Sequence, residues 1–331
     1  MRIDSSAPTR IDLAGGTLDI WPLYLFHDNA QTLNAAISLR AHCSIRGRQD
    51  RRVRLISEDT GVEVDADGWQ SLDGAWQLPL LARLVRYFHV SGIDLVTRSE
   101  SPFGAGIAGS SALNVAVAGG LAAWAEREIA GETLLGIAMN VEAQVINVPT
   151  GAQDYRPAYY GGVSSVKLSV DGVRRVPLDI DLEELQSRLV LCYTRASRNS
   201  GINNWDVMKR HIDGDAEVFE RFAHIRDIAV AMREALAKSD WPEVGRQLRL
   251  EWDNRKRLAP GVTTPDIDRM IDAAAAAGAL GAKVCGAGGG GCLFCFTDPA
   301  NVPAVRDALA SSGAELLDFH IEATGLKISR S

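Results

Sequence analysis

The chain has 331 residues, of which 46% are apolar and 23% are charged, and its formal net charge is −7. This composition excludes a disordered chain, a collagen-like repeat and a bare coiled coil, and the length suits one large or two medium-sized domains. The small acidic excess argues against nucleic acid as a partner. No apolar run approaches the roughly 18 residues needed to cross a membrane, and the first residues lack the apolar core of a secretory signal. We therefore expect a cytoplasmic protein with no membrane partner.

The pattern of apolar and polar residues in the first half predicts a mixture of strands and helices. In chain order, we expect strands within 33–57, a helix over 78–90, a strand over 93–97, a buried helix over 112–124, a helix over 133–146, and strands over 162–169 and 188–193. The alternation within 33–57 indicates strands that turn one face toward solvent.

The second half of the chain is mostly helical in its pattern. We expect helices over 204–212, 216–238, 242–257 and 265–278, strands near 282–285 and 292–297, a helix over 302–311 and a last strand. The pattern changes near 175–187, which indicates an α+β chain of two lobes, residues 1–180 and 181–331. Cys292 and Cys295 lie three residues apart in an apolar run, so their thiols should point to opposite faces of a strand. We therefore expect reduced cysteines rather than a metal or redox pair.

The strongest chemical signal is the segment 102–112, which reads Pro-Phe-Gly-Ala-Gly-Ile-Ala-Gly-Ser-Ser-Ala between a predicted strand and a predicted helix. Its glycines allow the backbone to approach a ligand closely, and the helix start directs free N–H groups into the loop. The hydroxyls of Ser110 and Ser111 can cap the helix or bind a metal or a phosphate oxygen. The segment lacks the lysine of a P-loop and fits the dinucleotide fingerprint poorly. It predicts a nucleotide-phosphate site of another kind.

Three further segments carry polar or glycine-rich patterns. Residues 286–291 contain five glycines, which predicts a close approach of the backbone to a ligand or to another loop. Near the N-terminus, a predicted strand carrying Arg10 leads through a glycine turn to Asp19. Glu142 lies on a predicted helix, and Asp154 follows in a loop. Glu142 could be a solvated helix residue, Asp154 a turn residue and 286–291 a wide β-turn, but the four segments occur together in one chain.

The order of these motifs resembles the GHMP kinase superfamily, named for galactokinase, homoserine kinase, mevalonate kinase and phosphomevalonate kinase. The matching motifs are A-P-x-R-I at 7–11, G-x-G-I-x-x-S-S-A at 104–112 and G-A-G-G-G-G at 286–291. Residues 14–19 and 151–162 are similar to the bacterial heptose-phosphate kinase branch. The resemblance implies a two-lobed kinase that uses ATP and Mg²⁺, with a ribosomal-S5-domain-2-like first lobe and a ferredoxin-like second lobe. It also implies a small sugar or sugar-phosphate substrate and a monomer or homodimer.

The resemblance further implies a role for individual residues. The ATP phosphates would be wrapped by Gly104, Ala105, Gly106, Ile107, Ala108, Gly109, Ser110 and Ser111. Ser110 and Glu142 would hold Mg²⁺, Asp154 would face the acceptor hydroxyl, and Arg10 would lie between Asp154 and the γ-phosphate. The substrate would contact Gly16, Asp19, Asp154, Tyr160, Gly288 and Gly289, with further pocket candidates in Tyr155, Arg156 and 195–201.

Several points stay open at the level of the sequence. Ala108 and Gly109 depart from the family's usual residues, so the metal position could belong to Ser110 or to Ser111. Leu18 replaces a usual threonine, which removes a hydroxyl near the acceptor. Asp154 could act as a base or only orient the acceptor. The alternatives to a sugar kinase are a mevalonate-pathway kinase or diphosphate decarboxylase, and a non-catalytic sensor of nucleotide and sugar.

Overall fold

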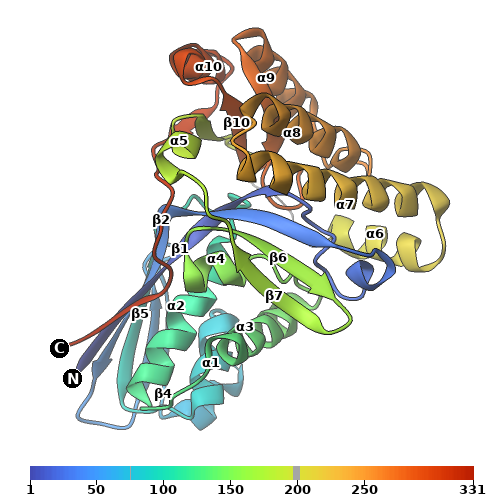
Figure 1. Cartoon of the computed structure of the whole chain (residues 1–331). Coiled ribbons are helices and arrows are strands. Elements are labelled where there is room, and N and C mark those ends of the chain that lie inside the picture. The colour runs from blue at the N-terminus through green and yellow to red at the C-terminus, as the bar shows by residue number, and fades with distance from the viewer. Residues whose placement is uncertain (75, 197–201) are drawn as a thin grey trace.

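The computed structural model describes residues 1–74, 76–196 and 202–331. Its strands form two sheets, one of eight strands and one of four, which lie at opposite ends of the molecule (Figure 1). The two chain termini lie side by side, where the amide of Arg2 donates to the carbonyl of Ser331 at 2.7 Å (Figure 1).

The large sheet contains β1 (Arg2–Ala14), β2 (Gln31–Gly47), β3 (Val53–Ser57), β4 (Val62–Ala66), β5 (Ile93–Ser99), β6 (Val163–Ser169), β7 (Gly172–Pro177) and β12 (Lys327–Arg330). The strand order is β12-β1-β2-β5-β3-β4, and β6 joins β2 and β7. The pairs are antiparallel except for β3 with β5, which run parallel. The sheet is therefore built mostly from the first 177 residues and is completed by the last strand of the chain.

Helices α2 (Gly109–Trp124) and α4 (Tyr155–Tyr160) lie on the large sheet, and α1 (Pro79–Phe88) and α3 (Gly131–Ile146) pack on α2. Helix α2 packs on β1 and β2 from one side and on α1 and α3 from the other, so it is buried along most of its length (Figure 1). Its small residues make this packing possible. A Cβ on Gly119 would lie 2.6 Å from Leu326, and one on Gly120 would lie 2.7 Å from Ser5.

The small sheet contains β8 (Leu189–Tyr193), β9 (Ala279–Val284), β10 (Cys292–Thr297) and β11 (Glu315–Leu317) in the order β11-β8-β10-β9, all antiparallel. The helices of this lobe are α5 (Leu182–Gln186), α6 (Ile202–Ile212), α7 (Ala216–Ala237), α8 (Trp241–Arg255), α9 (Pro265–Ala276) and α10 (Val302–Ser311). Short 3₁₀ turns are η1 (Leu23–Phe26), η2 (Trp69–Gly74) and η3 (Pro299–Asn301). Numbered along the chain, the strand order is 4-1-3-2 with helices between the first and second and between the third and fourth strands. This is the ferredoxin-like arrangement that the resemblance implied.

The structure corrects the expectation of a solvent-facing side for the first part of 33–57. Residues 31–37 are buried on both faces of the sheet, because α7 packs against this end of β1 and β2. Leu33 and Ile37 share one apolar core with Met232 and Phe294 of the second half. The tail also differs from the expected single last strand, since β11 joins the small sheet and β12 joins the large one.

The expected orientation of Cys292 and Cys295 toward opposite faces of one strand is confirmed. Cys292 and Cys295 belong to different apolar clusters on the two sides of β10, and all five cysteines are buried. Within the described residues, no helix is both long and apolar enough to cross a membrane.

Candidate active site

The segment 104–111 forms a loop that leads directly into α2. Gly104 and Gly106 have positive φ angles of 68° and 74°, and the non-glycine Ala108 also has φ 61° immediately before the helix. Carbonyl groups of the loop form hydrogen bonds with other parts of the chain. For example, the carbonyl of Ile107 accepts from the Arg10 amide at 3.0 Å. The first amides of α2 have no partner within their own helix. The arrangement therefore leaves N–H groups and the positive helix end available to an anion.

Ser110 and Ser111 do not cap the helix, because both hydroxyls point to one carboxylate. Ser110 donates to Oε1 of Glu142 at 2.6 Å, and Ser111 donates to Oε2 at 3.0 Å. Ser111 is buried, whereas Ser110 is exposed. Burial raises the pKa of Glu142, and the serine hydrogen bonds oppose that shift by stabilising the charged form. The two elements that carry these side chains, α2 and α3, are neighbours in the first lobe.

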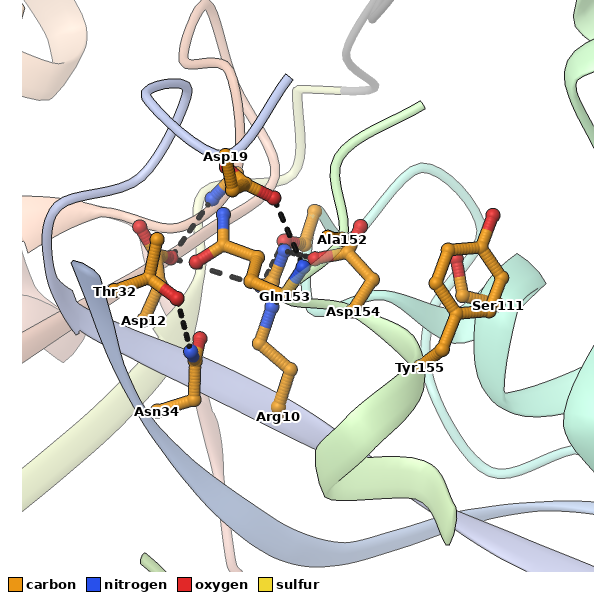
Figure 2. A network of polar contacts seen from close by, with 12 residues as sticks. Arg10, Asp12, Asp19, Thr32, Asn34, Ser111, Ala152, Gln153, Asp154 and Tyr155 are labelled. Atoms are coloured by element: carbon orange, nitrogen blue, oxygen red, sulfur yellow. Dashed lines mark hydrogen bonds and ion pairs between the residues drawn. The ribbon is translucent and has the colours of Figure 1, made fainter. Parts of the chain in front are cut away.

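Arg10 of β1 connects the loop to Asp154. Its Nη2 lies 2.6 Å from Oδ1 of Asp154, and its Nη1 donates to the carbonyl of Gly106 at 3.0 Å. Figure 2 shows the Arg10 side chain reaching up to Asp154 between the strand and the start of α4. Burial by itself lowers the pKa of Arg10, but the charges of Asp154 and Asp12 outweigh it and hold that pKa above its ordinary value. The guanidinium is therefore a fixed positive charge.

Asp19 lies beside this pair and is almost fully buried. Its Oδ2 accepts from the amide of Gln153 at 2.9 Å, as Figure 2 shows, while its Oδ1 has no hydrogen-bond partner among the described residues. Burial and the neighbouring charge of Asp154 raise the pKa of Asp19 to about 6. A Cβ on Gly151 would lie 2.2 Å from the Asp19 carboxylate, so only glycine permits this approach. An unpartnered buried oxygen of this kind can accept a hydrogen bond from a ligand hydroxyl.

The glycine-rich turn at 286–291 packs on the loop of the first lobe. The amide of Cys292 donates to the carbonyl of Ala105 at 2.6 Å, and a Cβ on Gly291 would lie 2.6 Å from the same oxygen. Gly288 is equally crowded, because its Cβ would lie 2.5 Å from the carbonyl of Val262. The close approach that the sequence predicted for 286–291 is therefore made to the loops that carry Ala105 and Val262. The amide of Gly289 already donates to Val262.

A buried cluster of charges, which sequence reasoning missed, joins the two lobes next to Arg10. Asp12 lies 2.7 Å from the ammonium of Lys283 and accepts from the Gly286 amide at 3.1 Å. From α8, Glu251 accepts from the Gly15 amide at 3.1 Å. The nearby charges of Lys283 and Arg10 outweigh burial and lower the pKa of Asp12. In the sequence, this cluster is indicated only by the position of Asp12 two residues after Arg10, because residues two apart in a strand lie on the same face.

Arg255 of α8 completes this cluster and contacts the glycine turn that precedes Asp19. It donates to the hydroxyl of Thr17 at 3.0 Å and to the carbonyl of Gly286. Gly16 lies against this cluster, since a Cβ there would lie 2.6 Å from Nη1 of Arg255 and 2.9 Å from Oδ2 of Asp12. The cluster therefore fixes the course of the chain toward Asp19.

Other residues expected near the substrate lie elsewhere or outside the described chain. Tyr160, at the far end of α4 from Asp154, donates to Glu132 at 3.1 Å. Arg156 also pairs with Glu132, and the Tyr155 hydroxyl turns to Glu142. Of the expected polar run at 195–201, residues 197–201 lie outside the described residues.

The side chains at the loop suit a hard cation better than a transition metal. In the part of the chain that the structure describes, no group of three or more His, Cys, Asp or Glu side chains is placed to hold a metal ion. Ser110 and Glu142 offer one hydroxyl and one carboxylate at the mouth of the anion-binding loop. Mg²⁺ takes oxygen ligands, keeps several waters and is commonly held by one or two carboxylates together with phosphates. These residues fit that ion.

Two relatives are similar to the chain over most of its length. It is 29% identical to the D-glycero-α-D-manno-heptose 7-phosphate kinase of Campylobacter jejuni over 337 residues, covering 98% of each chain. It is 25% identical to the galactokinase of a Roseiflexus species, covering 92% of this chain and 86% of that protein. The crystal structure of a D-glycero-D-manno-heptose 1-phosphate kinase from Bacteroides thetaiotaomicron superposes with a TM-score of 0.80 at 24% identity, covering 99% of both chains.

Two family models match separate parts of the chain, the GHMP kinase N-terminal domain at residues 76–162 and the GHMP kinase C-terminal domain at residues 232–315. The first match contains the loop and Glu142, and the second contains Lys283 and the glycine-rich turn. Together they cover about half of the sequence. The chain belongs to the GHMP kinase family, whose members use ATP as the phosphate donor, generally with Mg²⁺.

Proposed function

We propose that this kinase transfers the γ-phosphate of ATP, with Mg²⁺, to a hydroxyl of a sugar or a sugar phosphate. Its similarity to heptose-phosphate kinases and to a galactokinase supports that class of acceptor. The observation that carries the proposal is the position of Arg10, whose guanidinium contacts both the Asp154 carboxylate and the Gly106 carbonyl. One buried cation thereby joins the acceptor side of the site to the phosphate loop.

The loop and the start of α2 would bind the ATP phosphates. Main-chain amides and the positive helix end attract the phosphate oxygens without needing a lysine in the loop. Ser110 and Glu142 would hold Mg²⁺, which supplies neutralisation of the phosphate charge when it is bound. The exposed Ser110 is better placed for this than the buried Ser111. Arg10 adds a permanent positive charge beside the transferring group, where phosphoryl transfer needs charge stabilisation.

The acceptor would lie between Asp154 and Asp19. Asp154 would accept a hydrogen bond from the reacting hydroxyl, either to orient it or to take its proton, a step that typically contributes 10²–10⁴-fold. The unpartnered Oδ1 of Asp19 would accept from a second hydroxyl of the same molecule. Two carboxylates that share one ligand favour a polyhydroxylated acceptor, because each needs a donor. The turn at 286–291 would close the site from the second lobe by its contact with the loop.

The test is a screen for ADP release with hexoses, heptoses, their phosphates, uronic acids and mevalonate as acceptors. We expect turnover with a sugar or a sugar phosphate. Turnover with mevalonate alone would contradict the acceptor class, and carbon dioxide release from a diphosphate substrate would identify a decarboxylase. ATP binding without ADP release on any acceptor would indicate a sensor.

Asp154→Asn tests the assigned role of the carboxylate. We expect turnover to fall at least 100-fold, because the reacting hydroxyl loses its charged partner, while ATP affinity stays within about threefold. The matched control is Asp179→Asn, which removes an exposed carboxylate in the same lobe. Normal turnover of the Asp154 variant would reject the role of Asp154.

A further inference from the structure

Tyr155 is a fully buried residue whose hydroxyl is turned toward the phosphate side of the site. The residue opens α4 directly after Asp154, and its ring belongs to the apolar core of the first lobe. Its hydroxyl donates to Oε2 of Glu142 at 2.6 Å. In Figure 2 the Tyr155 ring rises beside Ser111, on the side of α4 away from Arg10. The sequence pointed to an acceptor pocket for this residue, so its contact with Glu142 needs a different explanation.

The two oxygens of Glu142 have different surroundings. Oε2 accepts from Ser111 and from Tyr155, both of which are buried. Among the described residues, Oε1 accepts from Ser110 alone, which is exposed. One oxygen is thus held by the hydroxyls of two buried residues, and the other contacts the hydroxyl of an exposed residue. The side chain of Thr150 interacts with the Tyr155 hydroxyl from the loop that precedes α4.

We propose that Tyr155 is a positioning residue for the magnesium site: its hydroxyl fixes Oε2 of Glu142 so that Oε1 and Ser110 are presented to the cation. This inference rests on the proposed function, because it takes Glu142 as the metal-binding carboxylate. Hydrogen-bond partners behind a metal ligand fix its orientation, and their loss typically lowers metal affinity or activity 10–100-fold.

The arrangement also connects the two ends of the reaction. Asp154 and Tyr155 are consecutive residues, so the peptide that places the acceptor-side carboxylate also places the hydroxyl behind Glu142. The acceptor side and the metal side are therefore held by the start of one short helix. A phenylalanine at 155 preserves the ring and its apolar contacts and removes only the oxygen. In the described part of the chain, this leaves Ser111 as the one donor to Oε2.

The experiment compares Tyr155→Phe with Tyr159→Phe by calorimetric titration of ATP at a series of Mg²⁺ concentrations. Tyr159 lies on the same short helix, and its hydroxyl has no hydrogen-bond partner among the described residues. We expect the Mg²⁺ concentration that half-saturates the effect on ATP binding to rise about tenfold in Tyr155→Phe and to stay unchanged in Tyr159→Phe. ATP affinity without Mg²⁺ should be the same in both variants and in the unmodified protein.

Glu142→Gln is the reference for loss of the metal ligand itself. It should raise the half-saturating Mg²⁺ concentration at least as much as Tyr155→Phe does. If Glu142→Gln shifts the titration and Tyr155→Phe does not, the positioning role is overturned and the proposed function stands. If the unmodified protein shows no Mg²⁺ effect on ATP binding, the proposed function fails and the inference fails with it.

A second variant covers the case in which Tyr155→Phe does not fold. Thr150→Val keeps the shape of the partly buried Thr150 and removes the side-chain hydroxyl that interacts with the Tyr155 hydroxyl. It should shift the Mg²⁺ titration in the same direction by a smaller factor, and an unchanged titration would overturn the positioning role. A lower melting temperature with an unchanged titration in either variant would show that the hydroxyls serve stability alone.

Discussion

Asp19 is a carboxylate held in an environment that disfavours its charge. Burial and the charge of Asp154 raise its pKa from 3.8 to about 6, and one of its oxygens lacks a hydrogen-bond partner in the described chain. Above that pH the folded protein holds a buried negative charge that the unfolded chain would expose to water. The residue therefore lowers stability at neutral pH, which is understandable where a side chain is kept ready for a ligand.

The loss of folding stability caused by Asp19 increases with pH. Between pH 3.8 and about 6 the folded state binds more protons at this site than the unfolded state, so stability falls as the pH rises through this window. The shift corresponds to about 3 kcal/mol above pH 6. Asp19→Asn remains neutral and should raise the melting temperature at pH 7.5, with a gain that shrinks as the pH falls toward 4. The same variant should lose turnover.

Thermal unfolding at several pH values checks this expectation. The control is again Asp179→Asn, whose exposed side chain should give the same melting temperature as the unmodified protein at each pH. The account of Asp19 is wrong if its asparagine variant is no more stable at pH 7.5, or if the difference grows on acidification.

Where a motif surrounds a residue, the sequence predicts a role for it. Arg10, Glu142 and Asp154 were predicted from their motifs, and the structure places them around the predicted loop. Asp12 and Lys283 were not predicted, because their contact joins positions that are 271 residues apart. A lysine in an apolar strand carries no local pattern that names its partner, so only the tertiary structure reveals such a pair.

At the scale of elements, long amphipathic or apolar segments were predicted within a few residues of their ends. Helices α2 and α3, expected at 112–124 and 133–146, begin two or three residues earlier and end as predicted. Short elements such as β4, β7, α4 and α5 were missed, because five or six residues give too little periodicity. The full burial of 31–37 was also unpredictable, since it depends on α7 of the other half of the chain.

The glycine-rich turn offers a test at this scale. Gly291 has φ +84° and no space for a Cβ beside the Ala105 carbonyl, whereas Gly214 has φ +87° and nothing within 4 Å. Alanine should therefore strain the backbone at both positions but displace the phosphate loop only at Gly291. We expect Gly291→Ala to lower kcat/KM for ATP tenfold or more and Gly214→Ala to leave it nearly unchanged.

Steady-state kinetics and melting temperatures of the two glycine variants separate the effects. Both should lose a little stability from the left-handed backbone. Equal kinetics in the two variants would mean that the contact between turn and loop does not support ATP binding.

At the scale of the whole molecule, the site depends on both lobes. The first half of the chain supplies the phosphate loop, Arg10 and the acceptor-side carboxylates of Asp19 and Asp154. The second half supplies the glycine-rich turn, Lys283 and α8. A shared apolar core and the buried charge cluster join the halves, so the turn is held firmly against the loop. The division at about residue 180 that we propose therefore separates two sheets but does not separate two independent sites, and β12 returns to the first sheet.

The most direct test is a crystal structure of the protein with Mg²⁺ and a non-hydrolysable ATP analogue. The account predicts phosphate oxygens against the main-chain amides of residues 106–111, with the cation between Ser110 and Glu142 and the terminal phosphate facing Arg10. A triphosphate bound at any other place, with this loop empty, would contradict it.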